Sequence, residues 1–194
     1  MDYHRILNRI KNDPRYAAGI QYGTPRKGHG EGSVKNHIAE LEATLYRLAD
    51  LLQPNDFVRL QILIHTHDTF KLWALRDVPI DNLNSHATLA AGYLRDMGCD
   101  ADLVAMCQWH DENFALWKRF VAKGAYNTTR FVNRVLGIQD IELYLVFTII
   151  DGFTFSKQEL AKRDITPMVR WFVEEVAKHR TCPRAHEALA ILGL

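Results

Sequence analysis

The chain has 194 residues, of which 47% are hydrophobic and 24% are charged, and its formal net charge is +1. This length and composition predict one globular domain with a full core. The balanced charge gives no global field for nucleic acid or anionic membrane, so we expect neither partner. The three cysteines form no metal or disulfide motif and the first residues contain no apolar signal segment, which together favour a cytoplasmic protein.

The first half of the chain predicts an N-terminal helix, a glycine-rich loop over residues 22–33 and two long helices. Ser33 can cap a helix that begins near Val34, and the apolar stripe of that helix places His37 on its inner face. After Pro54, the strongly apolar stretch 60–73 predicts a buried helix. That helix carries the pair His67 and Asp68.

The second half predicts further helices, separated by a loop over residues 77–84 and by capping residues. One helix begins after Asn84 or Ser85 and another after Asp100 or Asp102. We expect the inner face of the latter to continue through Leu103, Cys107, His110 and Phe114. Later helices are predicted over residues 128–136, 140–153 and 183–192, and another is predicted to begin at Thr166 and Pro167 with a core stripe that reaches Val176. Alternating strand patterns are absent from the sequence, which therefore predicts an all-α, single-domain helical bundle.

Several polar side chains occupy the apolar faces of these predicted helices. A buried imidazole or carboxylate is costly unless it is paired, and a bound cation would neutralise the carboxylates. The inward-facing set comprises His37, His67, Asp68, His86, His110 and Asp151. Nitrogen and oxygen donors that face one another across a helical bundle suit one or two divalent metal ions. A single such histidine is more often a packing residue, so the prediction depends on the whole set.

Two neighbours of this set are interpreted differently. His65 lies two residues before His67 and points to another face, so we expect it to pack or to support a ligand from behind. Asp111 and Glu112 follow His110 directly and are rival ligands within that cluster; with Trp109 they are candidates for lining a pocket.

The order H…HD…H…H…D resembles the HD-domain superfamily of metal-dependent phosphohydrolases over about residues 34–155. Residues 1–33 and 156–194 would flank this core. The resemblance implies an all-α fold in which His37, His67, Asp68 and Asp151 hold one metal, while His86 and His110 add a second. Asp68 would bridge the two metals. Lys71 stands at the position of the lysine in the family's HD-x-x-K pattern.

The expected reaction is attack of metal-activated water on the phosphorus of a small phosphorylated metabolite or nucleotide. Asp68 and Lys71 are the predicted catalytic residues, with Lys71 stabilising charge on the phosphoryl oxygens. The donor types leave the metal open among Fe, Mn, Co, Ni, Zn and Mg. Charged residues near the glycine-rich loop are predicted to contact the substrate, although the same residues fit a solvated connection equally well. These residues are Arg26, Lys27, His29 and Glu31.

Two other functions remain open from the sequence. A branch of the same superfamily uses a six-ligand set to hold two irons and oxidise a C–H or C–P substrate, and Tyr22 and Glu31 are candidates for closing such a site. A non-enzymatic nucleotide-binding module would be expected to have lost a ligand. A homodimer is also possible, because aromatic residues such as Trp117 and Trp171 suit either a core or a dimer contact.

Overall fold

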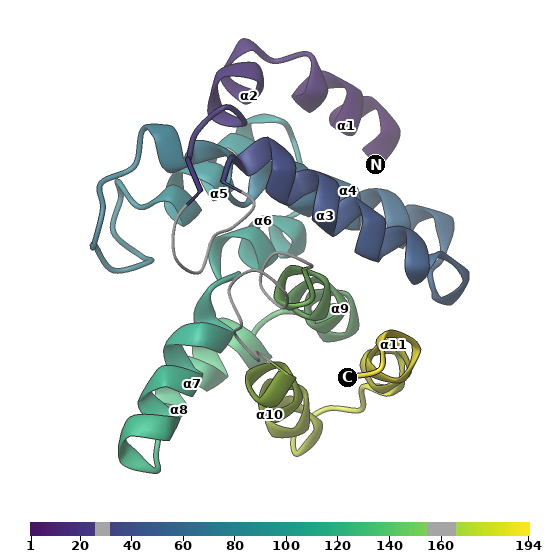
Figure 1. The fold of residues 1–194 in the computed structure, drawn as a ribbon, viewed down its shortest axis with the longest axis vertical. Helices are drawn as coiled ribbons and strands as arrows, with labels where there is room; N and C mark the ends of the chain where they lie inside the picture. The colour runs from purple at the N-terminus through teal and green to yellow at the C-terminus, as the bar shows by residue number, and fades with distance from the viewer. Residues whose placement is uncertain (26–31, 155–165) are drawn as a thin grey trace.

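Helices form every regular element of the computed structural model, which describes residues 1–25, 32–154 and 166–194. The fold is all-α and forms a single domain, as the sequence predicts. Figure 1 shows the N-terminal helices at one end of the molecule and the C-terminal helices toward the other, with α9 between them. Among the described residues, no helix has the length and apolarity that crossing a bilayer would require.

The described residues up to position 72 form four α-helices and two short 3₁₀ helices. In chain order they are α1 (Tyr3–Lys11), α2 (Pro14–Gly19), α3 (Val34–Arg47), η1 (Ala49–Leu51), α4 (Pro54–Thr66) and η2 (Thr69–Leu72). The hydroxyl of Ser33 accepts a hydrogen bond from the Asn36 N–H at 3.3 Å, which confirms the predicted cap of α3.

The described residues from 73 onward add seven α-helices and a π-helical turn. They are α5 (His86–Asp96), α6 (Ala101–Gln108), α7 (Glu112–Lys123), α8 (Thr128–Phe131), the π-helical η3 (Val132–Leu136), α9 (Ile141–Gly152), α10 (Thr166–Ala177) and α11 (Pro183–Leu192). Between the alternatives that the sequence left open, Ser85 caps α5 and Asp100 caps α6. Gly193 ends α11 in a left-handed conformation with φ +76°.

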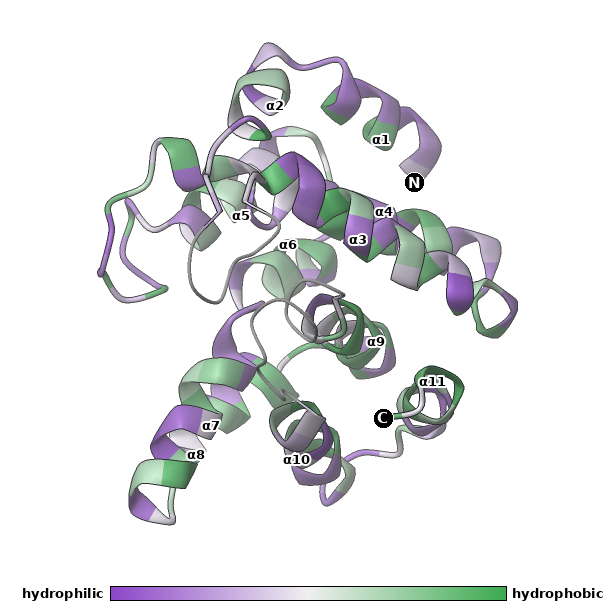
Figure 2. Ribbon diagram, viewed as in Figure 1, coloured by the Kyte–Doolittle hydropathy of each residue, from purple (hydrophilic) through white to green (hydrophobic). Residues whose placement is uncertain are grey.

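Helix α9 is the centre of the core. Nearly all of its residues are buried, and it packs against α3, α4, α10 and α11. Its hydrophobic character along most of its length is visible in Figure 2. A helix that is apolar on all sides is stable in water only when neighbours cover it on all sides. Asp151, near the carboxyl end of α9, is therefore held in place by the best-packed element of the fold.

The predicted helix over residues 60–73 does not run through to its end. Helix α4 ends at Thr66, and the 3₁₀ turn η2 begins at Thr69. The Thr69 hydroxyl donates to the His65 carbonyl at 2.6 Å, which a continuing helix would bond with the Thr69 N–H. Hydrogen bonding by this side chain thus accompanies a turn that carries His67 and Asp68.

The predicted inner face over residues 103–114 is also interrupted. Helix α6 ends at Gln108 and α7 begins at Glu112, so Phe114 is 39% exposed rather than buried. The ring of His110 uses Nδ1 to bond the Cys107 carbonyl at 2.8 Å, and the Trp109 carbonyl accepts a hydrogen bond from the Tyr144 hydroxyl at 2.7 Å. These bonds hold an irregular turn where the apolar period alone predicts a helix.

Helix α2 contacts the turn η2 through Gly19. A Cβ at Gly19 would lie 2.1 Å from the Thr69 carbonyl oxygen, so any larger residue would displace one of the two segments. The close approach therefore requires glycine at this position. Through it, the N-terminal helices support the turn that follows Asp68.

Candidate metal centre

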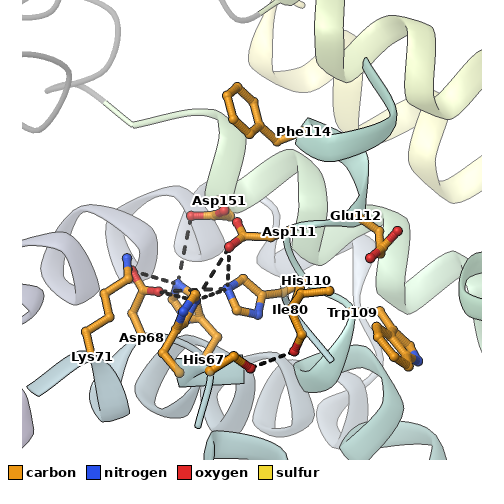
Figure 3. A network of polar contacts seen from close by, with 12 residues as sticks. His67, Asp68, Lys71, Ile80, Trp109, His110, Asp111, Glu112, Phe114 and Asp151 are labelled. Carbon is orange, nitrogen blue, oxygen red and sulfur yellow. Dashed lines mark hydrogen bonds and ion pairs between the residues drawn. The ribbon is translucent and has the colours of Figure 1, made fainter. Parts of the chain in front are cut away.

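The structure brings together all six residues that the sequence predicts as metal ligands. They come from widely separated parts of the chain and mostly from helix ends. His37 lies in the first turn of α3, His86 begins α5, and Asp151 lies near the end of α9. His67 and Asp68 lie between α4 and η2, and His110 lies between α6 and α7. Figure 3 shows this cluster with its polar contacts.

Three of these residues form a first donor group. His37 Nε2 lies 3.1 Å from Asp151 Oδ1, and His67 Nε2 lies 3.9 Å from the same oxygen. The three potential ligand atoms lie within 4.8 Å of one another, and both histidines are buried. A group of two imidazoles and a carboxylate with this spacing can hold a metal ion.

A second donor group comprises Asp68, His86 and His110, whose potential ligand atoms also lie within 4.8 Å of one another. The Nε2 atoms of His86 and His110 are 3.2 Å apart. Two imidazole nitrogens at that distance either share one proton or direct two lone pairs toward the same point. Two lone pairs directed toward one point suit a metal ion.

Asp68 lies between the two groups and faces each with a different oxygen. Its Oδ2 is 4.0 Å from His37 Nε2 and 3.7 Å from His67 Nε2. Its Oδ1 is 3.7 Å from His86 Nε2 and 3.8 Å from His110 Nε2. This is the placement that a bridging carboxylate would need.

His67 fits a metal because one of its two ring nitrogens has no hydrogen-bond partner among the described residues. His67 Nδ1 bonds the Leu63 carbonyl at 3.1 Å, which selects the tautomer with its proton on Nδ1. His67 Nε2 is then a buried acceptor with no hydrogen-bond partner among the described residues. Burial lowers the pKa of His67 to about 4 against the opposing effect of Asp68 and Asp151, so its ring is neutral near pH 7. A neutral imidazole is the form that ligates a metal.

Lys71 lies directly beside Asp68. Its ammonium group forms an ion pair with Asp68 Oδ2. Burial raises the pKa of the Asp68 carboxyl, but Lys71 and the neighbouring imidazoles lower it further, so the net pKa lies well below the usual range. Asp68 is therefore an anion near pH 7, as a bridging ligand must be.

A cavity of about 540 Å³ lies next to the second donor group. Its lining includes Tyr22, Lys71, Arg76, His86 and Asp111. Arg76 donates a hydrogen bond to the Tyr22 hydroxyl at 3.0 Å. The cavity is of the size that small-molecule sites commonly have, and its lining includes two cationic side chains, of which Lys71 pairs with Asp68.

Asp111 is the residue of this region whose position the sequence left undecided. Its Oδ2 lies 3.5 Å from the Nε2 atoms of both His86 and His110. Burial raises the pKa of its carboxyl, but His110 and His86 lower it by more, and the net pKa lies below the ordinary value. The adjacency of Asp111 to His110 was the available signal, and the sequence did not separate it from Glu112.

Glu112 and His65 have structural roles. Glu112 is fully buried and accepts hydrogen bonds from Arg130 and Arg134, away from the histidines in Figure 3. His65 bonds the Tyr16 hydroxyl and Glu42, which agrees with its expected packing role. Trp109 lies against Arg134, whose guanidinium carbon is 4.5 Å from the ring centroid.

The predicted substrate contacts of the glycine-rich loop lie outside the described residues. These predictions concern Arg26, Lys27, His29 and Glu31. The aromatic residues considered for a dimer contact pack within the chain: Trp117 of α7 and Trp171 of α10 have ring centroids 5.5 Å apart.

In comparisons with protein families, curated proteins and solved structures, nothing matches this chain. The chemical character of the site therefore rests on its own residues. These are two buried groups of histidine and aspartate that can hold metal, joined by Asp68.

Proposed function

We propose that this protein is a binuclear, metal-dependent phosphohydrolase of the HD type that acts on a small phosphorylated metabolite or nucleotide. The observation that carries the proposal is the position of Asp68, with Oδ2 toward His37 and His67 and Oδ1 toward His86 and His110. A carboxylate between two sets of imidazoles is the arrangement expected where two divalent ions share one ligand.

Six residues would hold the ions: His37, His67 and Asp151 on one side, His86 and His110 on the other, and Asp68 between them. Divalent ions bound there would supply a water of lowered pKa and would polarise a phosphoryl oxygen. The protein keeps His67 neutral by burial and holds its Nδ1 on the Leu63 carbonyl, so that Nε2 faces the site.

Lys71 and the cavity supply the contacts for an anionic substrate. The Lys71 ammonium lies at the boundary between Asp68 and the cavity, where it can donate hydrogen bonds to phosphoryl oxygens that gain charge in the transition state. Arg76 lies further along the same cavity and can receive a second anionic or polar part of the substrate. A substrate of metabolite or nucleotide size suits the volume of about 540 Å³.

The test combines metal content with turnover. Protein purified without chelator and without oxygen is expected to contain about two ions per chain and to release phosphate from one or more members of a panel of nucleotides and sugar phosphates. Lys71→Ala is expected to slow turnover while the metal content stays at that of the wild type, because a protonated lysine is not a ligand. Iron as the dominant metal, with oxygen consumption and no phosphate release, would replace hydrolysis by the oxidative alternative. Nucleotide binding that persists after metal removal, without turnover, would favour a binding module.

A further inference from the structure

The second donor group contains more than the three residues that define it. Asp111 Oδ2 is 3.5 Å from His86 Nε2 and 3.5 Å from His110 Nε2, and those two nitrogens are 3.2 Å apart. Asp68 Oδ1 is 3.7 and 3.8 Å from the same nitrogens. Ligands about 2.1 Å from one ion in a tetrahedral array lie roughly 3.4 Å from one another. The measured separations are close to that value.

We propose that Asp111 is a seventh metal ligand, which completes a shell of two imidazoles and two carboxylates around the second ion.

The local structure supports this role independently of the distances. Asp111 occupies the N-cap position of α7, where an aspartate side chain usually accepts a hydrogen bond from the first turn of its helix. Its side chain makes no such cap bond. In Figure 3 the carboxylate points toward His110 instead, whereas Phe114 of the same helix lies away from the histidines. The Asp111 side chain therefore lies beside the two imidazoles instead of capping the helix.

The irregular turn between α6 and α7 makes this placement possible. On a continuous helix, neighbouring residues would point about 100° apart. In the structure the Nδ1 of His110 is fixed on the Cys107 carbonyl, and both His110 and Asp111 reach the same point. The turn after α4 does the same for His67 and Asp68.

Asp111 would make the two halves of the centre equivalent in donor type. Each ion would have two histidines, one aspartate of its own and the bridging Asp68 as ligands. The unshared aspartate would be Asp151 for the first ion and Asp111 for the second. Three carboxylates do not cancel the charge of two divalent ions, so the centre would keep a net positive charge for an anionic substrate.

This inference rests on the proposed binuclear centre, and its test uses metal binding rather than turnover. Chelator-stripped wild type and Asp111→Asn are titrated with Mn²⁺ by calorimetry, and the loaded proteins are examined by electron paramagnetic resonance. We expect the wild type to bind two ions with a spectrum of a coupled pair. Asp111→Asn should retain one ion, bind the second at least about 10-fold more weakly and give the spectrum of an isolated ion.

Asp77→Asn is the matched control. Asp77 lines the same cavity, it is not among the groups around the two imidazoles, and its φ of +58° is one that asparagine tolerates. It should bind two ions as the wild type does. If Asp77→Asn weakens the second ion as much as Asp111→Asn, general cavity charge explains the effect and the proposal is wrong.

Two further outcomes separate this inference from the proposed function. Equal binding of two ions by the wild type and Asp111→Asn would overturn the ligand role of Asp111 and leave the binuclear hydrolase intact. A wild type that binds fewer than two ions would overturn both. If Asp111→Asn fails to fold, Asp111→Glu provides the same test, because a retained carboxylate should preserve the coupled pair where a structural fault would not.

Discussion

His65 and His67 are two residues apart at the end of the same helix, both are almost fully buried, and their surroundings differ completely. His65 uses both ring nitrogens within the protein: Nδ1 contacts the Tyr16 hydroxyl at 2.7 Å and Nε2 contacts Glu42 at 3.0 Å. His67 uses Nδ1 only, and its Nε2 faces the donor groups without a hydrogen-bond partner in the described part of the chain.

Burial alone does not distinguish a candidate ligand from a packing residue, because both histidines are almost fully buried. His65 has two protein partners outside the donor groups, and a metal would have to displace one of them. A buried nitrogen without a partner carries a desolvation cost that a bound ion would remove. The unpaired Nε2 of His67, rather than its apolar surroundings, distinguishes it from His65.

The largest effect is expected for the carboxylate beside His67. Asp68→Ala removes the bridge, so both ions should be lost and hydrolysis should fall on the order of 10³-fold, equivalent to about 4 kcal/mol of transition-state stabilisation. Metal analysis and phosphate release measure the two effects. His65→Gln is the control and should keep the metal content of the wild type. Retention of full metal content by Asp68→Ala would show that another residue is the central ligand.

Removal of the metal should affect the site that contains His67 and not the hydrogen bonds of His65. An ion present at about 100 times its dissociation constant stabilises the folded state by about 2.7 kcal/mol. For a chain of this size, a chelator should then lower the melting temperature of the wild type by about 5–10 °C. Thermal denaturation with and without chelator measures the shift. The shift should persist in His65→Gln and disappear in Asp68→Ala.

His65→Phe tests the stability that the hydrogen bonds of His65 contribute. The phenyl ring leaves the Tyr16 hydroxyl and Glu42 without their imidazole partner, so the free energy of unfolding should fall by about 1–3 kcal/mol. Urea denaturation of the metal-free protein measures this change. The number of ions bound should remain that of the wild type, and its loss would mean that the two histidines act as one unit.

The smallest effect concerns the pH dependence of the His65 network. The hydrogen bond from His65 lowers the pKa of Glu42, while burial opposes the shift. A carboxyl with a lowered pKa stabilises the fold above its unfolded pKa of about 4.3, and that contribution disappears as the pH falls through the folded pKa. Wild type should therefore exceed Glu42→Gln in stability by up to about 1 kcal/mol at pH 7 and lose that advantage below pH ~4. Urea denaturation at several pH values would reveal a constant difference if the pairing were absent.

The sequence predicts much of this arrangement because most of its signals are local. Ser33, Ser85 and Asp100 each form a cap with the backbone of their own helix. The ligands on helices, such as His37 and Asp151, follow from the apolar period of each helix. The sequence also predicts that the six residues meet, although His67, Asp68 and His110 lie in turns and not on the helical faces that the apolar period predicts.

The remaining features depend on contacts that periodicity does not encode. The ends of α4 and α6 coincide with side-chain bonds of Thr69 and His110 to backbone carbonyls. The orientation of Asp111 depends on that irregular turn, and a continuous helix would have directed it elsewhere. The requirement for glycine at position 19 appears only when Thr69 is seen against it.

The hydrogen bond between His37 and Asp151 joins positions 114 residues apart. An ion held by both residues would close a long loop and so lower the conformational entropy of the chain, as a covalent crosslink does. Constraints that close long loops give the largest entropic stabilisation in principle. The first of these ligands is synthesised long before the last. Loading of the first donor group would therefore follow the emergence of α9 from the ribosome, and a truncated chain ending before Asp151 would have His37 and His67 without the carboxylate that completes that group.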